Sequence, residues 1–241
     1  MLNIRKAEER GRTKIDWLNS YHSFSFGHYY DPNHVGFNSL LVINDDFVKA
    51  GGGFGEHGHK NMEIVTYVLE GELAHKDSLG NVETIKAGEV QRMSAGSGIR
   101  HSEFNYSKSD DVRFLQIWFL PEQENIDPGY EQKDFTEADK LNKLQLVVSP
   151  NGEDGALKIN QDVEIYASIL EKDKSLNFDA KKREIWLQVA SGRFEVNGEV
   201  VKNGDGAYIN AAEDLEIKGL DDKSEFLIFS MTKFSMTKEN N

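Results

Sequence analysis

Short apolar runs separated by tight turns are the feature of this sequence that most limits its fold. The runs are rich in β-branched and aromatic residues, and turn signals such as Asn151-Gly152 and Asn197-Gly198 separate them. They cover Ser39–Ile43, Ile64–Leu69, Val112–Leu120, Ile185–Val189, Arg193–Val196 and Glu225–Ser230. Helical periodicity is weak, and only 137–146 could make a short helix or turn. This pattern predicts an all-β protein.

The chain has 241 residues, enough for one large domain or for two of about 120 residues each. A polar stretch at 121–150 holds three of the four prolines and breaks the rhythm of strands. We therefore expect an N-terminal domain at 1–122, a connection at 123–143 that packs partly on a barrel, and a C-terminal domain at 144–241.

Both halves of the chain share a loose pattern of strand, glycine turn, strand, tight glycine turn and strand. Gly71 and Gly88 mark the two turns in the first half, and Gly192 and Gly204 mark them in the second. The repeat suits two small antiparallel β-barrels or jelly rolls in tandem.

Composition excludes several partners and cofactors. The chain has no cysteine, so a metal would need nitrogen and oxygen ligands rather than thiolates. The net charge of −13 argues against direct nucleic-acid binding and against binding to anionic membranes. No apolar run is long enough to span a membrane, and the first residues lack the apolar segment of a signal peptide. We therefore expect a cytoplasmic protein.

Histidine is distributed unevenly along the chain. All seven histidines lie at or before position 101, which predicts one chemical site in the N-terminal domain. His57 and His59 are two residues apart and therefore point to the same face of a strand. Glu63 shares their parity if that strand is not bulged. Downstream, His101 and Glu103 repeat the spacing.

Two strands that meet could thus offer three imidazoles and one or two carboxylates to one centre. Such a set, with open positions for water or substrate, suits Fe(II), Ni(II), Co(II), Mn(II) or Cu(II). A structural zinc site would normally be closed by four ligands. On the residues alone, a chance pairing of histidines on one strand remains an alternative.

Glycine spacing around these histidines resembles the two motifs of the cupins. Gly51, His57, His59, Glu63 and Gly71 match the first motif, with one extra residue before the last glycine. The second motif is matched by Gly88, Gly96, His101 and Asn105, while Ser94 replaces its proline. With the segments 21–32, 52–80, 90–103 and 129–135, the whole N-terminal half is similar to the pirin family of bicupins.

The resemblance implies a bicupin fold with one mononuclear metal in the N-terminal barrel and a degenerate C-terminal cupin. It implies His57, His59, His101 and Glu103 as metal ligands, although most cupins would use Glu63 as the carboxylate ligand. Glu63 would then lie next to the ligands without binding the metal, or act as a base near the open coordination positions. Alternatively, it is a paired carboxylate inside the barrel. Iron is the first expectation for the divalent metal, with nickel, cobalt, manganese, copper and zinc as alternatives.

Similar family members act as quercetin 2,3-dioxygenases, which open flavonols with O₂ and release CO. The resemblance thus predicts a small aromatic substrate such as a flavonol, with Glu103 or Glu63 as the proton acceptor. Four candidate wall residues of an apolar pocket are Phe24, Phe26, Phe54 and Met93. His22 and His28 could line its mouth, whereas His34 is expected to be exposed and His75 to make a structural hydrogen bond.

Two other functions fit the same residues. One is a metal-binding regulatory or redox-sensing protein that acts through protein partners, which the acidic charge would suit. The other is a binding module for a different small molecule. A fold by itself cannot distinguish these functions from catalysis.

Overall fold

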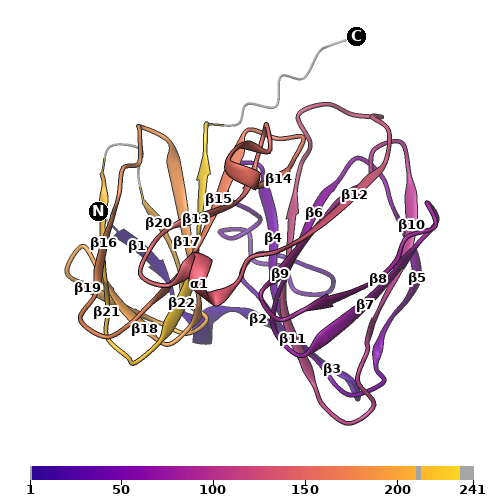
Figure 1. Ribbon diagram of the computed structural model, residues 1–241, viewed down its shortest axis with the longest axis horizontal. Coiled ribbons are helices and arrows are strands. Elements are labelled where there is room, and N and C mark those ends of the chain that lie inside the picture. The colour runs from indigo at the N-terminus through magenta and orange to yellow at the C-terminus, as the bar shows by residue number, and fades with distance from the viewer. Residues whose placement is uncertain (1, 210–212, 234–241) are drawn as a thin grey trace.

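The computed structural model describes residues 2–209 and 213–233, and it confirms an all-β protein (Figure 1). All six expected strands are present, as β4 (Leu40–Val48), β6 (Glu63–Glu70), β11 (Val112–Phe119), β17 (Glu184–Ser191), β18 (Arg193–Val196) and β22 (Ser224–Met231). The expected short helix is α1 (Glu137–Lys140), and two 3₁₀ turns lie at η1 (Ala7–Glu9) and η2 (Glu153–Gly155). Among the described residues no helix is long and apolar enough to cross a membrane.

The N-terminal domain consists of a seven-stranded and a four-stranded sheet. The larger sheet has the order β12 (Gly129–Asp134), β9 (Glu89–Ser94), β6, β11, β4, β3 (Leu18–His22) and β2 (Gly11–Lys14). The smaller sheet has the order β5 (Gly53–His59), β10 (Ile99–Asn105), β7 (Glu72–Asp77) and β8 (Val82–Lys86).

The C-terminal domain repeats this arrangement of seven and four strands. Its larger sheet has the order β1 (Leu2–Arg5), β20 (Gly206–Ile209), β17, β22, β15 (Val163–Leu170), β13 (Gln145–Ser149) and β14 (Leu157–Lys158). Its smaller sheet has the order β16 (Ser175–Phe178), β21 (Leu215–Gly219), β18 and β19 (Glu199–Lys202). The tandem bicupin architecture is therefore confirmed in its jelly-roll form, with two sheets in each domain instead of one closed barrel.

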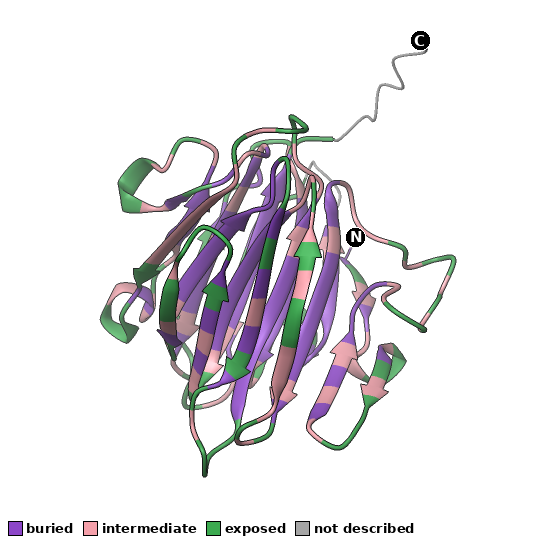
Figure 2. Cartoon of the chain, turned by 90° about the vertical axis from the view of Figure 1, so that its right-hand side faces the viewer, coloured by how far each residue is buried: buried purple, intermediate pink, exposed green. Residues whose placement is uncertain are grey.

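The two seven-stranded sheets pack against each other at the centre of the molecule. Tyr67 and Phe119 of the N-terminal sheet share one core with Ile165 and Phe229 of the C-terminal sheet. The rings of Phe119 and Phe229 have centroids 6.1 Å apart. Buried residues run along the long central strands, while exposed residues occupy most loops and parts of the outer strands (Figure 2). Because this core belongs to both domains, each domain supports the other.

Two short segments join sheets across the expected boundaries. Strand β1 pairs with β20 and so extends the C-terminal sheet, although it begins the chain. Strand β12, inside the expected connection, pairs with β9 of the N-terminal sheet. The domain boundaries expected from the sequence stay a prediction, and the sheet pairing follows them only in part.

Gly71 and Gly192 have the same structural role in the two domains. Each connects the larger sheet to the smaller one, with positive φ angles of 76° and 71°. A side chain at Gly71 would place its Cβ 2.8 Å from the carbonyl oxygen of Asp111, and one at Gly192 would collide with Ser224. Both positions therefore require glycine, which accounts for the repeat seen in the sequence.

A buried ion pair connects the domains beside the shared core. The guanidinium of Arg113 donates to both carboxylate oxygens of Asp45, at 2.9 and 3.1 Å. The same group donates to the carbonyl oxygen of Ala190 at 2.8 Å and to Asn203 at 3.2 Å, both in the C-terminal domain. Arg10 lies 3.5 Å from Asp45 as a second cation.

We predict that Arg113→Met lowers the free energy of unfolding by about 3 kcal/mol, as judged by urea unfolding. This is the low end of the range for breaking a buried ion pair, because Arg10 still faces the Asp45 carboxylate. As a control, Arg193→Met breaks the solvent-exposed pair with Asp221 and should lower the free energy of unfolding much less. Equal effects of the two substitutions would contradict the structural role of Arg113.

Candidate metal centre

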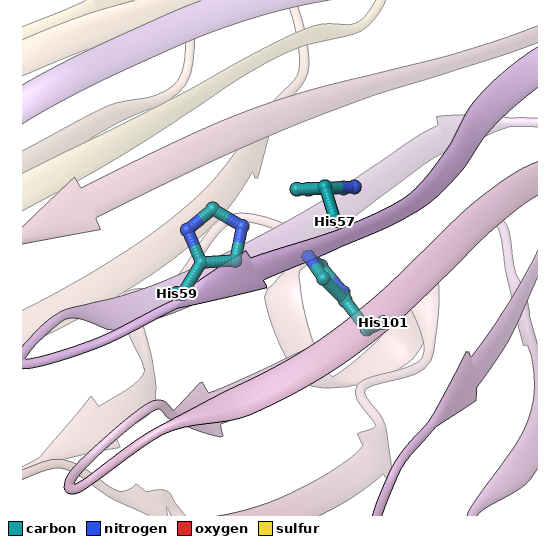
Figure 3. Close-up of side chains that lie close together, drawn as sticks. All are labelled: His57, His59 and His101. Atoms are coloured by element: carbon teal, nitrogen blue, oxygen red, sulfur yellow. The ribbon is translucent and has the colours of Figure 1, made fainter.

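Three histidines from two neighbouring strands converge in the N-terminal domain. His57 and His59 lie on β5, and His101 lies directly opposite His57 on the antiparallel strand β10. Their ring centroids are 4.4 to 4.9 Å apart, and the rings point toward one another (Figure 3). One nitrogen of each ring lies within 4.8 Å of the others. Of the described residues, the groups that could hold a metal all belong to this domain.

Glu103 lies on the same strand as His101, two residues further on. The pairing with β5 shifts here because β5 has one extra residue between His57 and Phe54, so that Glu103 pairs with Phe54. Strand β10 itself is regular, and its pairing with β7 continues through both residues. A carboxylate oxygen of Glu103 lies within 4.8 Å of ring nitrogens of His75 and His101, in a second group that shares His101 with the first. Glu103 is 2 % exposed, so its carboxylate is held inside the domain.

A chain of hydrogen bonds orients the Glu103 carboxylate. The hydroxyl of Thr66 donates to Oε1 of Gln116 at 2.7 Å, which leaves the amide NH₂ to donate to Oε2 of Glu103 at 2.9 Å. Thr66 and Gln116 belong to β6 and β11 of the larger sheet. Only Oε1 of Glu103 is left without a hydrogen-bond partner.

Several buried polar atoms in this cluster have no partner. They are Nε2 of His59, both ring nitrogens of His101 and Oε1 of Glu103. Unpaired buried polar atoms are costly and rare, so a group of them at one point indicates a ligand. His57 places Nδ1 2.8 Å from the carbonyl oxygen of Gly55, which leaves its Nε2 available. Three imidazoles and one carboxylate fit a divalent transition metal.

Burial and neighbouring imidazoles keep these rings neutral. Desolvation, followed by the repulsion of His101 and His57, lowers the pKa of His59 to about 4. Desolvation and the repulsion of His57 and His75 lower the pKa of His101 to about 3. Neutral imidazole is the form that binds metals, so both rings are ready to coordinate at neutral pH.

Glu63, the other expected carboxylate, lies elsewhere. It begins β6 in the larger sheet, so it does not continue the strand that carries His57 and His59. Its Oε2 accepts from the hydroxyl of Ser94 at 2.8 Å and from the backbone N–H of Asn160 at 3.2 Å. Burial raises its pKa. Glu63 therefore connects the two domains, and its expected role as a ligand or a base stays a prediction.

A cavity of about 480 Å³ opens beside the histidines. This volume lies in the range of about 300 to 1,000 Å³ that is usual for small-molecule sites. Its lining comprises Thr13, Trp17, Leu18, Ser20, His22, Phe26, Asn44, Asp46, Gly53, Phe54, Gly55, His57, His59, Glu103, Gln116 and Trp118. This lining combines four aromatic side chains with hydroxyl, amide, imidazole and carboxyl groups, and Trp118 lies two residues from Gln116 on β11.

The expected wall residues divide into two groups. Phe26 and Phe54 line the cavity. Phe24 and Met93 do not, because Phe24 packs against Trp186 with centroids 4.7 Å apart and Met93 lies in an apolar cluster with Ile64. The expectation was wrong for these two because a strand pattern does not show which buried face borders a cavity.

The remaining histidines have separate roles. His22 lines the cavity, where its ring bonds to Asn44 at 2.7 Å and Thr13 at 2.8 Å. His28 is exposed, and His34 pairs with Asp31 at 2.7 Å. His75 makes the expected structural hydrogen bond, to Asp77 at 3.0 Å.

Asp46, Gln116 and Trp118 are cavity residues that the sequence did not reveal. They lie on β4 and β11, which are neighbours in the sheet although about seventy residues separate Asp46 from Gln116 in the sequence. No local motif marks them, and only the pairing of distant strands brings them to the histidines.

Two tandem jelly rolls with a histidine cluster in the first define a bicupin of the metal-binding type. Comparisons with known proteins agree with this class. The family described as Pirin matches residues 3–119, and that described as Quercetinase C-terminal cupin domain matches residues 146–231. The chain belongs to the pirin family.

Individual relatives match nearly the whole chain. Quercetin 2,3-dioxygenase from Escherichia coli K12 is 47 % identical over 96 % of this chain and 99 % of its own. A pirin-like protein from Caulobacter vibrioides is 36 % identical, over 95 % of this chain and 99 % of its own. A structural match is the crystal structure of the bacterial pirin YhhW from E. coli in complex with nickel(II), with a TM-score of 0.90. Its sequence is 47 % identical, and the match covers 96 % of this chain and 99 % of that chain.

We predict that Gln116→Leu weakens metal binding by about 10- to 100-fold, the usual effect of losing a group that orients a ligand. The substitution removes the N–H that holds Oε2 of Glu103, so the carboxylate can turn away from the imidazoles. Metal affinity would be measured by competition with a chelator. Gln188→Leu, at a buried glutamine of the C-terminal domain, is the control and should leave affinity unchanged.

We predict a pH-dependent contribution of His101 to the stability of the metal-free protein. Its pKa is lowered on folding, so the unfolded chain binds more protons below the usual histidine pKa of about 6.5. The stabilisation is therefore complete above that pH and declines as the pH falls toward 3. In thermal unfolding, the wild type should lose stability relative to His101→Gln between pH 7 and pH 4. A difference that does not change with pH would contradict this.

Proposed function

We propose that the protein is a metal-dependent dioxygenase that cleaves flavonols of the quercetin type with O₂ and releases CO. The observation that carries this proposal is the group of unpartnered imidazole and carboxylate atoms at the end of an aromatic cavity. Support comes from the E. coli relative, which is named quercetin 2,3-dioxygenase and matches 96 % of this chain. Flavonols are flat and aromatic, and the aromatic side chains of the cavity lining suit such a substrate.

We propose His57, His59, His101 and Glu103 as the residues that hold the metal. When bound, a divalent metal would act as a Lewis acid that favours the deprotonated hydroxyl of the substrate. Nickel is present in the structure of the E. coli relative, whereas iron was the first expectation from the sequence. The ligand set suits either metal.

The side chains of the cavity position the substrate and exclude water. Trp17 and Phe54 contact each other edge to face at 5.0 Å, and Phe26 contacts Trp118 in the same way at 5.5 Å. These rings form a wall against which the flat rings of a flavonol can stack. By displacing water they also strengthen the electrostatic interactions at the histidines.

Glu103 is the proposed acceptor of the substrate's hydroxyl proton. It lies in the cavity lining, and the hydrogen bond from Gln116 engages Oε2 while Oε1 has no partner. A base must lie within hydrogen-bond reach of the proton it takes, and Glu103 meets that condition for a substrate bound beside the histidines. Glu63 does not line the cavity, so we assign it no proton transfer.

We predict that Glu103→Ala loses both the bound metal and at least about 100-fold in flavonol cleavage, since base and ligand are removed together. Metal content by elemental analysis, O₂ consumption and CO release would be measured on the same sample. Glu63→Gln should retain metal and turnover within a few-fold. Retained metal with full turnover in Glu103→Ala would contradict the assignment, and loss of turnover in Glu63→Gln with metal retained would restore the role of Glu63.

A further inference from the structure

The cavity contains a second carboxyl group that the proposed function does not use. Asp46 lies on β4, where it pairs with Ser20 on β3 and with Phe114 on β11. It lines the cavity and is 3 % exposed. Asn44, two residues earlier, lines the same cavity, so this face of β4 presents two polar side chains to it.

Most polar groups on this wall already have partners. The ring of His22 is held between Asn44 and Thr13, at 2.7 and 2.8 Å. Asp46 is different: a side-chain hydrogen bond with Ser20 engages its carboxyl group, but Oδ1 is buried without a partner. The cavity is the space next to this carboxyl, and the terminal torsion of an aspartate is soft enough to turn either oxygen toward it.

Four unpartnered side-chain atoms belong to described residues of the cavity lining. Those of His59 and Glu103 are explained by the metal centre. The other two are the acceptor Oδ1 of Asp46 and the donor Nε1 of Trp118. An aromatic ligand that carries hydroxyl groups would satisfy both kinds of atom.

Among the described residues, the groups that shift the pKa of Asp46 include no cation. Desolvation, followed by the repulsion of Asp45 and Glu103, raises its pKa to about 7, against the stabilising hydrogen bond of Ser20. The guanidinium of Arg113 donates its hydrogen bonds to Asp45 and to the carbonyl oxygen of Ala190 in the C-terminal domain. A buried carboxyl in these surroundings gains strongly from one more hydrogen-bond donor.

We propose that Asp46 accepts a hydrogen bond from a hydroxyl group of the substrate other than the one presented to the metal centre. Asp46 is thereby the residue that selects polyhydroxylated flavonols over the unsubstituted ring system. The identity of the substrate class rests on the proposed function, whereas the vacant acceptor is a property of the cavity itself.

The test compares quercetin with 3-hydroxyflavone, which keeps the metal-directed hydroxyl and lacks the others. Wild type, Asp46→Asn and Asp46→Leu would be loaded with the same metal, and both Kd and kcat/KM would be measured for each compound. Leucine has a similar size and no acceptor, whereas asparagine keeps an acceptor oxygen. Because each compound is compared across variants, differences in the acidity of the two ligands cancel.

In Asp46→Leu, quercetin should bind about 10- to 100-fold more weakly, the usual effect of leaving a buried hydrogen-bond donor unpaired. Binding of 3-hydroxyflavone should change less than about threefold, and Asp46→Asn should retain most of the preference for quercetin. Metal content and thermal unfolding show whether each variant is intact, and Asp46→Ala replaces Asp46→Leu if that protein does not fold.

The outcomes separate the two proposals. If wild type releases CO and Asp46→Leu keeps the full preference for quercetin, Asp46 does not recognise the substrate and the proposed function stands. If wild type binds flavonols without turnover, the proposed function fails, while the dissociation constants still test Asp46. If wild type binds neither compound, the inference about Asp46 is overturned as well.

Discussion

The antiparallel pairing of β5 with β10 is the interaction on which the candidate site depends. It places His101 opposite His57 and brings His59 to the same face, while the regular course of β10 keeps Glu103 on the face of His101. The extra residue in this pairing lies on β5, between His57 and Phe54, and such bulges often occur next to functional sites. The two strands alone would leave the Glu103 carboxylate free to rotate, and Gln116 of the larger sheet removes that freedom.

The second domain packs against the first, and its described residues form no group that could hold a metal. Its two sheets enclose a continuous apolar core that includes Phe194, Ile217 and Phe226, without a histidine. The N-terminal domain instead keeps a cavity and several buried polar groups, which are costly to fold. The shared core between the larger sheets offsets this cost, because apolar area buried by both domains stabilises each. Glu63 belongs to this junction, since it bonds to Asn160 across the domains.

The cavity joins two kinds of recognition in one space. Imidazoles and Glu103 form the candidate metal site, aromatic rings line other parts of the cavity, and Asp46 adds a hydrogen-bond acceptor. A flat aromatic molecule with several hydroxyl groups can use all three at once. A purely apolar ligand would bind less well in this cavity, because such a ligand would leave the carboxyl of Asp46 unpaired.

The sequence by itself determined those features that depend on local geometry. Strands such as Ile64–Leu69 were predictable from side-chain type and turns, Gly71 from the need for a positive φ, and the shared face of His57 and His59 from the two-residue period of a strand. Only the tertiary structure decided the place of Glu63. The chain turns after His59 and enters another sheet, where parity with the histidines no longer applies. Asp46 and Gln116 were unpredictable for a related reason: periodicity assigns a face within one strand, whereas long-range pairing and burial decide which strands become neighbours.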